Sequence, residues 1–195
     1  DFAADLTLEP GKPPVLQGDQ GLSQKGPQPG NASYYYSLTR LATRGTVTVD
    51  GETVPVTGEA WLDREWSTSA LGAELAGWDW FALQLDDGRE LMFYRLRRKD
   101  GASEPWSRGS LVAADGSSRT LQAEEILATP LSTWKSPSGA VYPGRWRLQL
   151  PGEALDLELL RGGCTIDDVA PLFARALPKL TSLQFRTTFD LEIAT

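Results

Sequence analysis

Two short segments concentrate tryptophan and carboxylate side chains in a pattern that could support acid chemistry. Residues 59–66 read EAWLDREW, and residues 77–85 read GWDWFALQL. A carboxylic acid that is buried beside aromatic rings tends to keep its proton at neutral pH, and such an acid can protonate a bound molecule. The same residues could equally form the wall of an apolar binding cavity, or a salt-bridged lid over an ordinary β-core.

Strand geometry divides these side chains between two faces, because alternate residues of an extended strand point the same way. One face of the first segment is expected to carry the acids and a tryptophan: Glu59, Trp61, Asp63 and Glu65. The other face is expected to carry Ala60, Leu62, Arg64 and Trp66. In the second segment, Trp78 and Trp80 face one way and Asp79 faces the other. Neither segment shows the apolar-in, polar-out alternation of a strand with one wet face.

Three ionisable residues, Asp63, Arg64 and Glu65, follow one another between tryptophans. An unpaired buried charge is too costly to persist, so pairing or a shifted pKa is expected. We therefore expect Arg64 to pair with a carboxylate close to Trp66 or Trp78, with the three residues at the rim or wall of a β-barrel. A structural salt bridge and a functional acid both remain open at this point.

Composition excludes several classes of function. The 195 residues carry a net charge of −7, which argues against binding to nucleic acid or to an anionic membrane surface. The chain has no histidine, so the usual general base of hydrolases and the commonest zinc ligand are missing. No aspartate-rich loop with calcium spacing is present. We expect no metal and no cofactor.

Glycine-containing turns divide most of the chain into β-like segments. Val alternates on both sides of Asp50-Gly51, a dipeptide that favours a type I′ hairpin turn. The same dipeptide recurs at three further positions, Asp87-Gly88, Asp100-Gly101 and Asp115-Gly116, and Pro151-Gly152 joins two later runs. These regularly spaced turns predict an all-β antiparallel meander, whose strands close into a barrel or form two sheets that pack as a sandwich.

The segments near the two ends of the chain do not show the β-strand pattern of the meander. Residues 10–32 are rich in Pro and Gly, which predicts a long irregular connection and no packed element. Residues 165–177 show helical spacing of apolar side chains behind a possible cap at Thr165, which predicts one short helix near the C-terminus. The chain begins with Asp1 and no signal segment is visible, so we interpret it as a fragment or a processed form.

Four segments together carry a resemblance to a known family: ASYYYSLTRL, VTGEAWLDREW, GWDWFALQLDDGRELMFYRLR and WKSPSGAVYPGRWRLQLP. In this order they resemble the AttH and carotenoid 1,2-hydratase family, which is lipocalin-like and also described as predicted secreted hydrolases, over roughly residues 1–160. The resemblance implies two lipocalin-like β-barrels. Residues 1–50 would hold the last strands and linker of the first barrel, and residues 51–195 the second, with an atypical part from residue 164 onward.

The resemblance also implies an activity, the addition of water across a C=C bond of an acyclic carotenoid. Such a site needs a protonated carboxylic acid, aromatic faces beside the developing cation and an apolar groove. The candidate catalytic acids are Asp63, Glu65 and Asp79. The candidate ligand-binding residues are Trp61, Arg64, Trp66, Trp78, Trp80 and Tyr94.

One departure from the family keeps a second function open. Carotenoid hydratases carry His-Asn-Trp where this chain has Arg64-Glu65-Trp66, and a guanidinium cannot replace imidazole as an acid or base at neutral pH. The alternative is a non-catalytic AttH-type carrier of an apolar isoprenoid or polyene in the cell envelope, with an ABC transporter as a candidate partner. Either version implies a periplasmic, secreted or membrane-associated parent protein.

Overall fold

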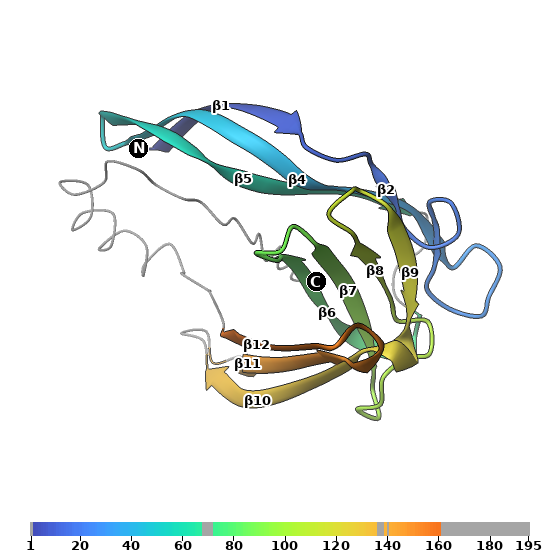
Figure 1. The fold of residues 1–195 in the computed structure, drawn as a ribbon. Coiled ribbons are helices and arrows are strands. Elements are labelled where there is room, and N and C mark those ends of the chain that lie inside the picture. Colours follow the sequence, from blue (N-terminus) through green and yellow to red (C-terminus); the bar gives the residue numbers. More distant parts are fainter. Residues whose placement is uncertain (1, 68–71, 136–138, 140, 161–195) are drawn as a thin grey trace.

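The computed structural model describes residues 2–67, 72–135, 139 and 141–160, which form three antiparallel sheets (Figure 1). The first sheet contains β1 (Phe2–Pro10), β2 (Val15–Leu16), β3 (Leu22–Gln24), β4 (Ala32–Val49) and β5 (Glu52–Ser67). The second contains β6 (Leu75–Gln84), β7 (Glu90–Arg98), β8 (Arg108–Val112) and β9 (Ser118–Gln122). The third contains β10 (Leu127–Lys135), β11 (Val141–Leu150) and β12 (Leu155–Leu160). The predicted all-β antiparallel meander is confirmed.

The predicted turns form where the sequence places them. Asp50 and Gly51 have φ angles of 49° and 84°, as a type I′ turn requires, and they join the long strands β4 and β5. Gly88, Gly101 and Gly116 have φ angles of 82°, 83° and 86°, a conformation in which glycine avoids the steric cost of a side chain. These three glycines lie in the connections between successive strands from β6 to β9.

The prediction for residues 10–32 is wrong, because part of this segment packs against β4. β2 and β3 both pair with β4, and Val15, Gln17 and Ser23 are buried, with 1–2% of each residue exposed. Pro and Gly correctly indicated turns, but they did not reveal the short pairings between them. The segment therefore adds polar side chains to the interior of the protein.

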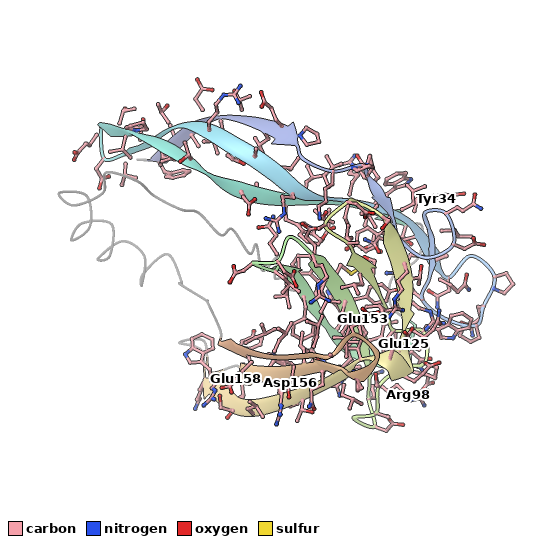
Figure 2. All side chains as sticks on the ribbon, in the orientation of Figure 1. Tyr34, Arg98, Glu125, Glu153, Asp156 and Glu158 are labelled. Carbon is pink, nitrogen blue, oxygen red and sulfur yellow. The ribbon has the colours of Figure 1, made fainter. Side chains whose placement is uncertain are left out.

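The second and third sheets share one apolar core. Its buried side chains come from both sheets and from the connection between them: Phe81, Leu91, Phe93, Leu111, Leu121, Ile126, Leu148 and Leu150. The 3-10 helices η1 (Ala123–Glu125) and η2 (Pro151–Glu153) lie at one end of these sheets. Arg119 joins them by donating to Glu125 at 2.8 Å and to Glu153 at 2.6 Å, two residues that lie close together in Figure 2.

A buried ionic network connects the first sheet to the second. Glu90 on β7 is fully buried and pairs with Lys12 Nζ at 2.7 Å and with Arg40 Nε on β4 at 2.5 Å. Arg40 also donates from Nη1 to both carboxylate oxygens of Glu59 on β5, at 2.7 Å. Lys12 Nζ also donates hydrogen bonds to the carbonyl oxygens of Gly88 and Ala113. The Glu90 carboxylate thus links its own strand, β7, to Lys12 in the N-terminal segment and to Arg40 on β4.

Two expectations from the sequence, a helix near the C-terminus and a division into two barrels, stay predictions. The helix expected at residues 165–177 lies outside the described residues. The boundary expected between residues 50 and 51 falls at the turn of the β4–β5 hairpin, whose strands pair from Val49↔Glu52 to Ser33↔Ser67. The division into two barrels stays a prediction.

We predict that Glu90→Gln lowers the free energy of unfolding by about 3 kcal/mol or more, because it leaves Lys12 and Arg40 charged and without their buried partner. Glu59→Gln is the matched control: it touches the same Arg40 but is exposed, and it should cost at most about 1 kcal/mol. Urea unfolding at neutral pH measures both. Equal losses in the two variants would contradict a special role of the buried carboxylate.

Candidate functional site

The β4–β5 pairing collects polar and aromatic side chains on one face of the first sheet. In the register, Ser37 lies opposite Asp63 and Tyr35 lies opposite Glu65. Because directly paired residues of antiparallel strands share a face, these four side chains point the same way. Trp61 joins them by alternation along β5. The predicted division of residues 59–66 into two faces is confirmed.

A face of β6 and β7 packs against this surface with aromatic and apolar residues. Trp80 lies opposite Tyr94 in the register, and the buried residues Tyr35, Met92, Tyr94 and Leu96 form one cluster with Trp61, Leu75, Trp80 and Trp106 packed against it. The indole nitrogen of Trp80 donates to the hydroxyl of Tyr35 at 3.3 Å. We call Tyr35, Trp61, Asp63, Trp80 and Tyr94 the aromatic–acid cluster.

Asp63 is the acid that lies inside this cluster. Its Oδ1 accepts from Ser37 Oγ at 2.5 Å and from Trp61 Nε1 at 3.0 Å. Ser37 Oγ in turn accepts from Gln17 Nε2 at 2.9 Å. Burial raises the pKa of Asp63 above its ordinary value, opposed by these hydrogen bonds and reinforced by the negative charge of Glu65. Desolvation therefore favours the protonated carboxyl here.

Tyr35 is held as a neutral phenol beside Asp63. Only 3% of the residue is exposed, and burial together with the nearby charge of Asp63 raises the pKa of Tyr35 far above its ordinary value. The phenol can therefore donate its own proton in a hydrogen bond while accepting one from Trp80. It lies between the acid and the aromatic rings of the second sheet, where it can orient either of them.

Glu65 lies at the edge of the cluster and is paired with a cation from the N-terminal segment. Lys25 Nζ is 3.0 Å from Glu65 Oε1, and Ser33 Oγ donates to the same oxygen at 2.5 Å. Lys25 Nζ also lies 3.6 Å from the centroid of the Tyr94 ring. Glu65 is thus an ionic neighbour of Asp63, whereas Asp63 has no cation bound to it among the described residues.

Asp79, the third candidate acid, lies on the opposite face of β6 from Trp80. It faces Arg95 and Arg97 on β7 at 3.9 Å and 3.6 Å between charged atoms. Burial raises the pKa of Asp79, while the two arginines act to lower it. Its Oδ2 and the Nε of Arg97 are buried without a hydrogen bond. The structure therefore separates Asp79 from Asp63 and Glu65.

Arg64 and Trp66 lie on the other face of β5, and the expected pairing of Arg64 with a carboxylate is not found among the described residues. In the part of the chain that the structure describes, Arg64 forms no ion pair, and its register partner is Tyr36. Trp66 is 51% exposed and contacts the rings of Tyr34 and Tyr36 at centroid distances of 5.9 Å and 6.3 Å. Tyr34 is labelled in Figure 2. Water can solvate the guanidinium on this exposed face, which removes the need for a partner.

The remaining aromatic candidates differ in exposure. Trp80 and Tyr94 belong to the aromatic–acid cluster, as does Trp61. Trp78 shares the face of Trp80 and pairs with Leu96 in the register, but it is 44% exposed. It therefore lies at the margin of the cluster.

Sequence reasoning missed one member of the cluster, Tyr35, and the polar residues next to the cluster. Tyr35 and Ser37 were visible in the tyrosine-rich segment, and the alternation of that strand could have placed both on one face. Gln17, Ser23 and Lys25 carried no such signal, because they come from the segment predicted to be irregular. Only the packing of that segment on β4 reveals them.

Among the described residues, no group of three or more carboxylate, cysteine or histidine side chains is arranged to hold a metal ion. Within those same ranges, no helix has the length and apolarity needed to cross a membrane.

Comparison with known proteins identifies relatives of this chain. A family model described as AttH-like matches residues 1–161. A crystal structure of a protein described as an AttH from Nitrosomonas europaea is 42% identical, with a TM-score of 0.72, over 77% of this chain and 46% of that one. Kievitone hydratase from Nectria haematococca is 22% identical, with a TM-score of 0.61 and the same coverage of each chain, and shows a shared fold. None of the curated proteins that were compared matches the chain.

These matches confirm the family and the fold class expected from the sequence. The chain spans less than half the length of both solved structures. The Trp-Leu-Asp-Arg-Glu-Trp and Gly-Trp-Asp-Trp-Phe motifs that carry the resemblance lie on β5 and β6, the two strands that contribute Trp61, Asp63 and Trp80 to the cluster. The fold is the lipocalin-like, all-β fold, and the chain belongs to the AttH-like family.

Proposed function

We propose that the protein of which this chain is part binds an apolar isoprenoid or polyene and adds water across one of its C=C bonds, with Asp63 as the general acid. The observation that carries the proposal is the burial of Asp63 among aromatic side chains, which raises the pKa of its carboxyl group. The fold shared with a hydratase supports the reaction class. An acyclic carotenoid is the named candidate substrate.

The reaction can be written with this site in three steps. The alkene π pair takes the proton of the Asp63 carboxyl, which forms a C–H bond and leaves a cation on the more substituted carbon. The electron-rich face of Trp80 stabilises that cation. A water oxygen forms the new C–O bond. The oxonium proton returns to the Asp63 carboxylate, so the net change is alkene plus water to alcohol.

The surrounding residues suit this role. Ser37 and Trp61 both donate to Oδ1 of Asp63, which leaves Oδ2 as the oxygen that can carry the proton. Tyr35 holds Trp80 through the indole nitrogen. Because hydrogen bonds from fixed donors stabilise the carboxylate once the proton has left, Asp63 can cycle between its two forms without moving.

We predict that Asp63→Asn lowers turnover by about 10²–10⁴, the contribution typical of a general acid, while ligand affinity changes little. The measurement is incubation of the full-length protein with an acyclic carotenoid, followed by mass spectrometry of the 1-hydroxy product. Asp87→Asn, an exposed aspartate in the turn between β6 and β7, is the matched control and should keep full activity. Tight binding by the wild-type protein without any product would overturn the hydratase proposal and favour a non-catalytic carrier.

The raised pKa of Asp63 gives a second prediction, on stability. A group whose folded pKa is raised contributes stability that is present below its unfolded pKa of about 3.9 and is lost as pH rises through the folded pKa. Asn does not ionise, so Asp63→Asn should gain stability relative to the wild type as pH rises from acid to neutral. Urea unfolding across this range measures the difference.

Asp87→Asn should show the opposite sign in the same experiment. Hydrogen bonds from Arg89 lower the pKa of Asp87, so its contribution is present above the unfolded pKa and lost as pH falls through the folded pKa. This variant should therefore lose stability relative to the wild type toward neutral pH. Parallel trends for the two variants would show that Asp63 is not desolvated in solution.

A further inference from the structure

Lys25 occupies a specific position at the edge of the aromatic–acid cluster, although it comes from the segment of the chain richest in Pro and Gly. Its ammonium lies 3.0 Å from Glu65 Oε1, 3.6 Å from the centroid of Tyr94 and 5.4 Å from the centroid of Tyr35. The side chain is 18% exposed. A cation over two aromatic faces and against a carboxylate is held by attraction from three directions.

The neighbours of Lys25 are themselves fixed by hydrogen bonds from β3 and β4. Ser23 Oγ and Tyr94 OH are 2.9 Å apart, which ties the Tyr94 ring to the strand that precedes Lys25. Ser33 Oγ binds Glu65 Oε1 at 2.5 Å. The carboxylate and the ring that receive the ammonium therefore each have one hydrogen bond in addition to their contact with Lys25.

We propose that Lys25 is a positioning residue that fixes Glu65 and Tyr94 at the edge of the cluster and, together with Glu65, sets the electrostatic environment of Asp63. Its importance for hydration rests on the proposed function, but the electrostatic effect itself does not. Lys25 acts through Glu65 and Tyr94 and takes no part in bond making.

The charges around Asp63 explain the direction of the effect. Glu65 lies two residues along the same face of β5, about 7 Å away by strand geometry, and its negative charge opposes ionisation of Asp63. The titratable groups that act on Asp63 come from two strands: Tyr35 on β4 and Glu65 on β5. Lys25, after β3, lies 3.0 Å from Glu65 Oε1, so its charge partly offsets that of Glu65.

Titration of the Asp63 carboxyl carbon by nuclear magnetic resonance tests this proposal in the folded full-length protein. Lys25→Met should raise the measured pKa of Asp63, and Glu65→Gln should lower it. The shift for Glu65→Gln should be at least about 0.4 pH unit, the value for a unit charge about 7 Å away in water, and the shift for Lys25→Met should have the opposite sign. The double variant should return toward the wild-type value, because both charges are gone.

Two controls separate this electrostatic role from a structural one. Lys25→Arg keeps the charge and should leave the titration near the wild-type value, and Lys99→Met, at an exposed lysine between β7 and β8, should have no effect. Shifts of the same sign in Lys25→Met and Glu65→Gln, or no shift in either, would overturn the proposal. If Lys25→Met fails to fold, Lys25→Gln, which removes the charge but keeps a polar side chain, takes its place in the same comparison with Glu65→Gln.

The outcome is independent of whether the protein is a hydratase. If the titrations move as expected and no substrate turns over, the proposed function fails and the role of Lys25 stands. If turnover occurs, the pH dependence of kcat should move in the same direction as the Asp63 titration. Turnover with an unshifted titration would refute the role of Lys25 alone.

Discussion

Burial of one carboxyl group, that of Asp63, is the constraint on which the site depends. The half-buried acid lies on the face of the β4–β5 hairpin whose Tyr35 and Trp61 pack against the aromatic face of β6 and β7. Two donors fix one of its oxygens, and burial raises its pKa. Removing this carboxyl group from water lowers the stability of the fold. In enzymes, groups with perturbed pKa values are concentrated at functional sites.

The rest of the structure keeps the two surfaces together around that acid. The fully buried Glu90 joins β7 to Arg40 on β4 and to Lys12, and Gln84 on β6 donates to the carbonyl oxygens of Thr39 and Ala60. These contacts lie on the same face of β6 and β7 as Trp80 and Tyr94. The same interface thus contains the ionic junction and, a few residues away along the strands, the aromatic–acid cluster.

Local patterns predicted the elements of the fold well, because they depend on neighbouring residues. Asp-Gly dipeptides marked the hairpin turns, and alternation placed Asp63 with Trp61 and separated Asp79 from Trp80. What could not be predicted depends on contacts between distant residues. The pairing of β4 with β5 brings Ser37 to Asp63, and the packing of β2 and β3 brings Gln17 and Lys25 to the cluster. The exposure of Arg64 could not be predicted either, because it depends on which face of β5 the second sheet packs against.

Infrared difference spectroscopy as a function of pH tests most directly whether the pKa of Asp63 is raised in the folded protein. The spectrum of Asp63→Asn is subtracted from that of the wild type at each pH, so that the other carboxyl groups, including Asp79, cancel. We predict that the protonated-carboxyl band of Asp63, which the variant lacks, persists to a higher pH than the band of an ordinary exposed aspartate. Disappearance of this band at or below the pH at which an exposed aspartate ionises would contradict the role of Asp63 as the acid.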